Sequence, residues 1–358
     1  MDILILGNGF DLAHSLKTKY SDFLKYYREK YKTPKMVGVE INDNFIYNNV
    51  WAKHFLNKTL NGNSWIDLEK EIYNVITNIS KLPYFKDDTT YEKYDKIIFF
   101  IAKDYWDFNF DEVRKYFREP SAINYRNCYC VKLKEFISFL YMQLRDFTRE
   151  FEKYLVSDVM PNVDKKENKY KFSLNTTRQK EKNKEVFILN FNYTNTFEKL
   201  YAKKNDNFII KNPVYIHGKI GNKDNNMVLG TKSFSNGNIT AEFNVFKKHH
   251  QRHRYGTIES YQHLLNLAKK HQGQVNFHII GHSLDDTDRN ILKHILLANP
   301  NSIINIYYHD EEQLVQMQNN IDLIITEEEV MAKVRFIRQH DTERGILIPI
   351  EEEILNPI

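Results

Sequence analysis

The chain has 358 residues, of which 42% are hydrophobic, so it can form one large domain or two smaller ones around a sizeable core. Its 51 basic and 47 acidic residues nearly balance, and a net charge of +4 argues against a dedicated nucleic-acid binder. No apolar run approaches the roughly 20 residues that span a bilayer. The two cysteines, Cys128 and Cys130, are too few for a four-cysteine zinc site. We expect a cytoplasmic protein with no membrane segment, because no basic leader precedes the first apolar run.

The sequence opens with a short apolar run and a glycine turn. Residues 2–6 (DILIL) predict a buried parallel strand, and apolar spacing predicts a helix over 12–31. Between them lies GNGFD, where Gly7 suits a tight turn and Gly9 lets backbone approach a phosphate. The dinucleotide fingerprint is incomplete, because Leu12 replaces its third glycine and the later ribose-binding acid is missing. These departures disfavour an ordinary dehydrogenase. The strand, glycine turn and helix together favour a nucleotide site over a turn with only a structural role.

From about residue 40 to 160 the pattern becomes helical and strand signals nearly vanish. WIDLEKEIYNVITNI shows helical spacing, KIIFFIAKDYW is compatible with a buried helix, and 128–159 predicts one long amphipathic helix. We expect a helical insertion at 40–160, closed by a polar linker at 161–184. The sequence leaves open whether this insertion covers a site, senses a trigger or forms an oligomer interface.

Strands and helices alternate again after residue 185. Helices are predicted at 195–204, 257–271, 287–298 and 311–322, and strands at 186–191, 213–218, 275–281, 302–309 and 334–339. With the first strand, this pattern predicts an α/β fold with a Rossmann-like, six-stranded, mostly parallel sheet, formed by 1–39 and 185–358. Ligands of such sheets bind beyond the carboxyl ends of the strands.

Four polar clusters follow predicted strands and should meet at that edge of the sheet. They are GNGFD (7–11), NFNYTNTFE (190–198), the pair His217 and Gly218, and GHSLDDTD (281–288). His217 is a candidate catalytic residue because it stands at a strand end beside a flexible glycine and in this company. The convergence of the four clusters is the main functional signal of the sequence.

Two motifs resemble those of a lipase and of a zinc protease, but each lacks one required residue. GHS at 281–283 resembles a lipase nucleophile motif, but Asp285 occupies the place of its last glycine and would crowd the turn. We expect instead a strand end and a helix capped by Ser283 or an aspartate. KKHHQRH (247–253) places His249 and His253 at helical spacing, but it lacks the glutamate of a zinc protease and is strongly basic. We therefore expect no metal site there.

The quoted motifs resemble a known family. LILGNGFDLAHSLKTKYSDFL resembles the opening of the AbiH family of bacteriophage abortive-infection proteins, and WIDLE (65–69), NFNYTNTFE, the His-Gly pair and GHSLDD extend the resemblance over nearly the whole chain. The series is also similar, more distantly, to the sirtuin fold and its NAD-consuming defence relatives. Asp11 and Thr194 replace the serine and aspartate usual there, and the four zinc cysteines of the deacetylases are missing. The resemblance implies NAD hydrolysis in antiphage defence rather than protein deacetylation.

The resemblance also implies roles for individual residues. His217 is the general base, and Asn192 orients the nicotinamide ribose or a water. The chemistry of the reaction, rather than the resemblance, suggests that Asp11 stabilises the cation or binds ribose hydroxyls. The implied cofactor-binding positions are Gly7, Asn8, Gly9, Phe10, Tyr193, Gly218, Gly281, Ser283, Leu284 and Asp285. NAD is the expected substrate and no metal is expected. A nucleotide ligand is the expected partner, a phage-derived trigger and a homo-oligomer stay open, and membrane and nucleic-acid partners are disfavoured.

Two alternative functions stay open from the residues alone. The domain is either a nucleotide-binding sensor or assembly module without catalysis, or a metal-dependent nuclease. The nuclease would use Asp11, Asp285, Asp286 and Asp288.

Overall fold

The computed structural model describes residues 1–31, 49–60, 66–80, 84–86, 96–101, 128–163, 170–172, 184–201, 208–234, 241–338 and 347–349. The chain divides into two compact units. The first comprises residues 1–18, 155–228 and 252–358, and the second comprises residues 19–154 and 229–251. Among the described residues, no helix combines the length and apolar character needed to cross a membrane.

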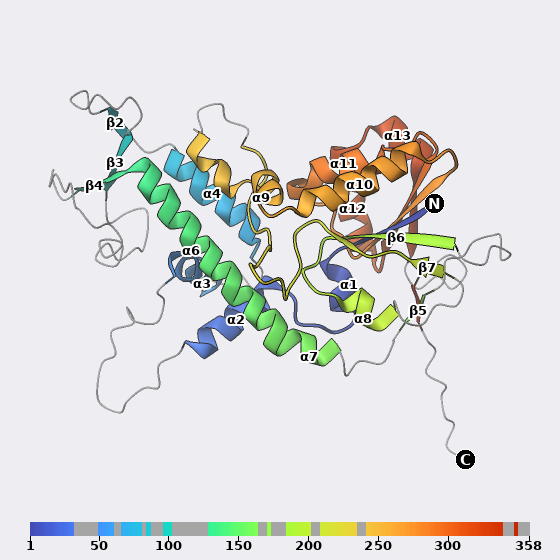
Figure 1. The fold of residues 1–358 in the computed structure, drawn as a ribbon, viewed down its shortest axis with the longest axis horizontal. Helices are drawn as coiled ribbons and strands as arrows, with labels where there is room; N and C mark the ends of the chain where they lie inside the picture. Colours follow the sequence, from blue (N-terminus) through green and yellow to red (C-terminus); the bar gives the residue numbers. More distant parts are fainter. Residues whose placement is uncertain are drawn as a thin grey trace, which may run out of the picture. The chain divides into compact units, whose positions relative to one another are not determined.

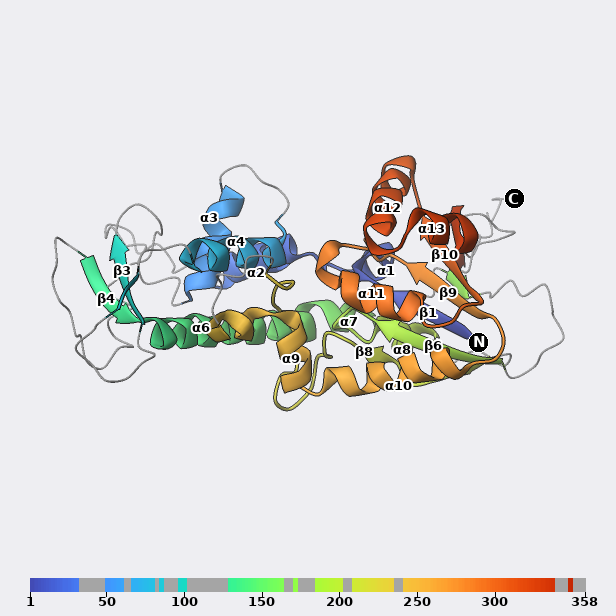
Figure 2. The same cartoon turned by 90° about the horizontal axis from the view of Figure 1, so that it is seen from above.

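A parallel sheet of seven strands forms the centre of the first unit (Figures 1 and 2). The sheet runs in the order β11, β10, β9, β1, β6, β7, and β8 also pairs with β6. The strands are β1 (Asp2–Leu6), β6 (Lys184–Asn190), β7 (Phe208–Ile210), β8 (Val214–Tyr215), β9 (Val275–Ile280), β10 (Ser302–Tyr308) and β11 (Val334–Arg338). The predicted α/β fold with a parallel sheet is confirmed. The predicted count of six strands is wrong, because β7 is too short to give a periodic signal.

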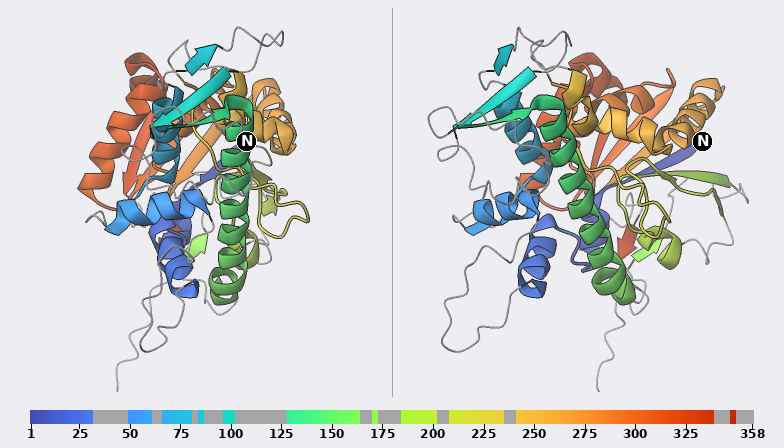
Figure 3. Two further views of the ribbon diagram at one scale, coloured as in Figure 1. Left: turned by 90° about the vertical axis from the view of Figure 1, so that its left-hand side faces the viewer. Right: turned by 60° about the vertical axis from the view of Figure 1, so that its left-hand side comes forward.

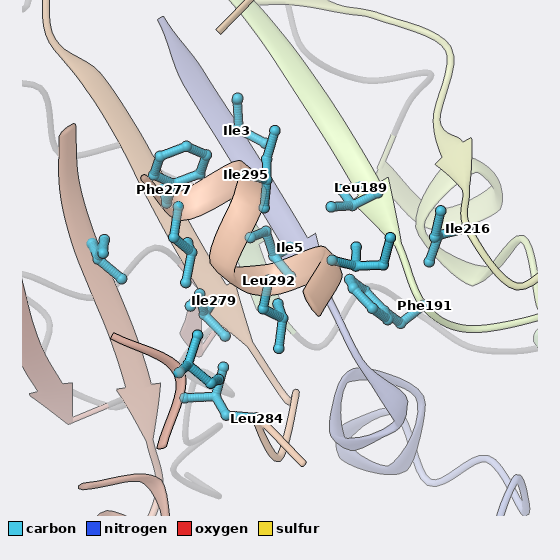
Figure 4. Close-up of a cluster of buried hydrophobic side chains, with 14 of the residues drawn as sticks. Ile3, Ile5, Leu189, Phe191, Ile216, Phe277, Ile279, Leu284, Leu292 and Ile295 are labelled. Carbon is cyan, nitrogen blue, oxygen red and sulfur yellow. The ribbon is translucent and has the colours of Figure 1, made fainter. Parts of the chain in front are cut away.

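Helices cover both faces of this sheet. The helices of the first unit are α1 (Asn8–Ala13), α7 (Met160–Val163), α8 (Thr196–Tyr201), α10 (Thr257–Lys270), α11 (Arg289–Leu296), α12 (Glu311–Ile324) and α13 (Glu327–Lys333). Ile3 and Ile5 of β1 pack with α10, α11 and α12 in one buried cluster (Figure 4). Leu4 and Leu6 point to the opposite face, where α1 and α8 lie, and are also fully buried. Burial on both faces explains why the four residues of β1 that follow Asp2 are all apolar.

The order of the strands fixes where a ligand site belongs. From the central strand β1 the chain continues to β6 on one side, and it later returns through β9 to β10 and β11 on the other side. The neighbouring carboxyl ends of β1, β6 and β9 therefore form a topological switch point, where open parallel sheets bind ligands.

The second unit is mainly helical and contains a small antiparallel sheet (Figure 3). Its elements are α2 (Tyr20–Lys30), α3 (Val50–Leu60), α4 (Leu68–Ser80), β2 (Tyr84–Lys86), β3 (Lys96–Ile101), β4 (Cys128–Lys132), α6 (Leu133–Tyr154) and the 3₁₀-helix η3 (Ala241–Phe246). Phe23 of α2 packs against Phe147 and Phe151 of α6, with ring centroids 5.2 and 4.9 Å apart. A buried ion pair joins Lys248 to Glu69, at 2.5 Å.

Two long helices predicted from the sequence are shorter in the structure. The helix predicted at 12–31 divides into α1 and α2, because Ser15 has a φ of +57° and cannot continue a right-handed helix. The helix predicted at 128–159 begins only at Leu133, because 128–132 form strand β4. It passes into a π-helix at Leu155–Val159.

Strands also occur where none was predicted. KIIFFI at 96–101 is β3, which pairs with both β2 and β4. A short apolar run rich in isoleucine and phenylalanine suits a strand or a buried helix, and its pairing partners decide between them. Within the predicted linker, Tyr170–Phe172 form β5, which pairs with β12 (Leu347–Pro349). The rest of KIIFFIAKDYW, most of the linker and Trp65 of WIDLE lie outside the described residues.

The ends of β1 and β9 approach each other through glycines. Gly7 N donates to the Ile280 carbonyl at 3.0 Å, and Gly9 N donates to the Gly281 carbonyl at 2.7 Å. A Cβ atom on Gly9 would lie 2.7 Å from Gly281 Cα, and one on Gly281 would lie 2.1 Å from Phe10 N. Gly281 also has a φ of +63°. No larger residue fits at these positions without moving backbone.

We expect Gly281→Ala to destabilise the protein by about 2–4 kcal/mol, from left-handed strain plus overpacking against backbone. Gly221→Ala is the matched control, since Gly221 has a φ of +77° and open space around its Cβ position. The control should lose only about 1 kcal/mol. Urea unfolding of both variants measures the difference, and equal losses would contradict the packing role of Gly281.

Candidate functional site

The polar clusters that follow the strands meet at the carboxyl edge of the sheet. Asn192 Nδ2 donates to the Gly7 carbonyl at 2.9 Å, which ties the turn after β6 to the turn after β1. The Phe191 ring lies 4.3 Å from the ring of His282 and 5.4 Å from that of His217. Figure 4 shows Phe191 and Leu284 at this end of the sheet. Segments from four places in the sequence thus form one neighbourhood, as predicted.

His217 is buried and lies two residues after the end of the short strand β8. Its Nε2 lies 3.2 Å from Asp288 Oδ1, and its carbonyl accepts from Val228 N at 2.7 Å. The next residue, Gly218, has a φ of +81°, and a Cβ atom there would lie 2.1 Å from the Asn226 carbonyl oxygen. The glycine therefore lets the chain turn sharply under Asn226 and holds the histidine backbone in place.

A buried ion pair stands behind the imidazole. Arg252 Nη2, from α9 (Lys248–Arg254), contacts Asp288 Oδ1 at 2.7 Å. The side chains of His217, Asp288 and Arg252 are only 6%, 10% and 5% exposed, so solvent screens their interaction little. The sequence did not predict that Asp288 would contact His217 or that Arg252 would contact Asp288. Asp288 was named only as a metal ligand, and Arg252 lies inside a basic run that predicts no buried contact.

The turn after β6 is organised by its own hydrogen bonds. Asn190 Oδ1 accepts from Asn192 N at 2.9 Å, and Asn190 Nδ2 donates to the Thr194 carbonyl at 3.3 Å. Tyr193 Oη donates to the carbonyl of Val228 at 2.8 Å, and Val228 N donates to the His217 carbonyl. Asn192 is consequently buried in a fixed position between the β1 turn and the His217 region.

Asp11 belongs to a separate polar cluster on α1. Thr194 Oγ1 donates to its Oδ2 at 2.5 Å. Burial raises the pKa of Asp11 to about 6, against the opposing effect of hydrogen bonds from Thr194 and Thr196. The carboxyl group points at this threonine pair, whereas His217 points at Asp288. Asp11 is connected to Asn192 through the Thr194 turn.

The turn after β9 holds a histidine and a strained leucine. Leu284 is buried with a φ of +58°, and its backbone N–H donates to His282 Nδ1 at 2.9 Å. The Asp285 side chain accepts from Thr287 N and caps the 3₁₀-helix η4 (Asp286–Asp288), so the predicted aspartate cap is confirmed. Ser283 is exposed, and its carbonyl accepts from Asn320. Sequence reasoning gave no role to His282, although it lies within a quoted motif.

The glycine turn uses its amides inside the protein. The N–H groups of Gly7, Gly9 and Phe10 donate to the carbonyls of Ile280, Gly281 and Gly7. The first two donors serve the contact between the ends of β1 and β9, and the third closes the turn itself, so none of the three is directed at a phosphate. The side chains of Asn8 and Ser283 are exposed at the same edge and accessible to a ligand.

The acidic residues of the nuclease alternative point to different partners. Asp11 faces Thr194, Asp285 caps η4, and Asp288 faces Arg252 and His217. Within the part of the chain that the structure describes, no group of three or more histidine, cysteine, aspartate or glutamate side chains is arranged to hold a metal ion. The geometry therefore gives the nuclease alternative no positive support.

The buried Asp11 carboxyl should make stability depend on pH. Because its folded pKa lies near 6 and the ordinary value is 3.8, the folded state binds the proton more tightly. Stability from this group is therefore complete below about pH 4 and falls as pH rises to about 6, by about 3 kcal/mol. We expect Asp11→Asn to remove this slope. Urea unfolding of both proteins at pH 4, 5, 6 and 7.5 tests it, and a constant difference between them would contradict the prediction.

Comparison with known protein families agrees with the resemblance seen in the sequence motifs. The family model described as "Bacteriophage abortive infection AbiH" matches residues 3–308, which include β1 except for Asp2, the second unit and the strands β6 to β10. A search of curated proteins found no match to the chain. A match over most of the chain shows the family, and the protein belongs to the AbiH family of bacteriophage abortive infection proteins.

Proposed function

We propose that this abortive infection protein hydrolyses NAD to nicotinamide and ADP-ribose on infection, which would halt the metabolism of the host cell. The carrying observation is the buried imidazole of His217, backed by Asp288 and placed beside the Asn192 turn at the switch point of a parallel sheet. The similarity of the glycine turn, the asparagine turn, the His-Gly pair and the GHSL turn to NAD-consuming defence proteins supplies the substrate class.

The reaction needs a site that positions water and accepts one proton. Water forms a bond from its oxygen to the ribose anomeric carbon, and the carbon–nitrogen bond to nicotinamide breaks. The electron pair of that bond leaves with the nicotinamide nitrogen, so the leaving group is neutral and no general acid is required. A cationic, oxocarbenium-like ribose develops on the way, by analogy with other glycosidic cleavages. The proton from water passes to a base.

His217 suits the role of this base. A neutral imidazole that donates Nε2–H to Asp288 carries its basic lone pair on Nδ1. Asn192 is held by the Gly7 carbonyl and offers its side-chain oxygen for orienting a ribose hydroxyl or the water. In this proposal Asp11 acts through Thr194, whose turn carries Asn192. Asn8 and Ser283 are the accessible positions for the nucleotide.

Nicotinamide release from NAD tests the proposal directly. The full chain is purified from infected and uninfected cells, and release is followed by chromatography for the unaltered protein, His217→Ala and Asn192→Ala. We expect release by the unaltered protein, a loss of about 100-fold or more in His217→Ala, and a loss of about tenfold to 100-fold in Asn192→Ala. Asp322→Asn, an exposed position on α12, serves as the control and should keep full activity.

Two outcomes would reject the proposal. Unchanged release in both site variants would remove these residues from the chemistry. Saturable NAD binding with no release in either preparation would favour the non-catalytic sensor instead.

A further inference from the structure

The candidate base belongs to an array of three buried side chains, in which His217 contacts Asp288 and Asp288 contacts Arg252. His217 Nε2 lies 3.2 Å from Asp288 Oδ1, and the same oxygen lies 2.7 Å from Arg252 Nη2. The second carboxylate oxygen, Oδ2, is 3.3 Å from His217 Nε2. The three residues come from the turn after β8, the end of η4 and helix α9, so only tertiary structure brings them together.

We propose that Asp288 and Arg252 are positioning residues that fix the tautomer of His217 and act in opposite directions on its protonation. Asp288 accepts the Nε2–H, which leaves the Nδ1 lone pair for the proton of the substrate water. This inference rests on the proposed function for the role of His217, but the array itself can be tested without any activity.

The charges of Asp288 and Arg252 explain why both residues are needed to keep His217 oriented and neutral. A buried carboxylate alone would favour imidazolium, and a protonated His217 cannot act as a base. The guanidinium of Arg252 neutralises that carboxylate, so the imidazole lies beside a pair with no net charge. The carboxylate still orients the ring and stabilises the imidazolium once it forms, as in other histidine–aspartate pairs.

Other polar groups face the same imidazole or its ion pair. The Tyr193 ring centroid lies 6.4 Å from that of His217, and His282 makes an edge contact with Phe191, which also lies beside His217. Tyr261 of α10 interacts electrostatically with Arg252, and burial raises its pKa, so it stays neutral over the working pH range. Asp288 contacts the His217 ring directly, and Arg252 contacts the same carboxylate, so the array places these two charges beside the imidazole.

Nuclear magnetic resonance of the ring nitrogens provides the test. The full chain is labelled with ¹⁵N at its 13 histidines, and the His217 signals are assigned by their loss in His217→Gln. We expect the unaltered protein to show protonated Nε2 and unprotonated Nδ1 at neutral pH. Arg252→Gln should raise the titration midpoint of His217 by about one pH unit or more, and Asp288→Asn should lower it by about one unit or more.

The control removes a nearby charge without touching the array. Arg289 is exposed and follows Asp288 directly in the chain. Arg289→Gln should move the His217 midpoint by less than about 0.3 pH units, because solvent and salt screen its charge. A shift as large as that of Arg252→Gln would mean that general electrostatics, rather than the array, sets the midpoint, and would overturn the proposal.

A second pair of variants keeps the test decisive where Asp288→Asn does not fold. Arg252→Gln combined with Asp288→Asn removes both buried charges, and it differs from Arg252→Gln only in the carboxylate. The double variant should titrate at least about one pH unit below the single variant. Equal midpoints, or an Nδ1–H tautomer in the unaltered protein, would overturn the proposal.

The tautomer and titration midpoint of His217 can be measured whether or not the protein hydrolyses NAD. The expected tautomer and opposite shifts, without nicotinamide release from NAD, would keep the array and reject the reaction. NAD hydrolysis with unshifted His217 midpoints would keep the reaction and reject the array. Where both hold, the acid limb of the pH–rate profile should move in the same direction as the midpoint in each variant.

Discussion

The close approach of two backbone turns is the constraint on which the candidate site depends. Gly7 and Gly9 lie against Gly281, and hydrogen bonds from their amides fasten the end of β1 to the end of β9. Side chains at these positions would separate the turns by the width of a methyl group. The position of Asn192 follows from this contact, because its amide is bonded to the Gly7 carbonyl. A glycine turn that resembles a phosphate loop thus serves first as a packing surface.

Electrostatics divides the edge of the sheet into two parts. On one part, His217 lies beside a carboxylate that a guanidinium neutralises, so the imidazole is oriented without a large net charge nearby. On the other, Asp11 is buried with two threonine hydroxyls, and burial makes its ionised form costly. The Asn192–Thr194 turn belongs to both, since Thr194 binds Asp11 and Tyr193 packs toward His217. Keeping ionisable groups buried at this edge of the sheet costs stability.

Two residues of the first unit that lie near His217 are also the residues that flank a segment of the second unit in the sequence. Residues 229–251 belong to that unit, and they leave and re-enter the first unit at Val228 and Arg252. Val228 donates its N–H to the His217 carbonyl, and Arg252 holds the carboxylate behind the His217 ring. The residues on either side of segment 229–251, Val228 and Arg252, therefore both contact the region around His217, through a hydrogen bond and an ion pair respectively.

The sequence by itself determined the parallel α/β fold, the strand–turn–helix at the N-terminus and the convergence of polar residues at one edge. It could do so because continuous apolar runs, glycine turns and helical spacing are local signals, and parallel strands place their ends together. Tertiary structure alone decided that 96–101 and 128–132 are strands, since apolar runs suit either element until a partner strand supplies hydrogen bonds. It also decided the array behind His217, because Arg252 and Asp288 lie 36 positions apart, and no local pattern marks a charged residue for burial beside a particular partner.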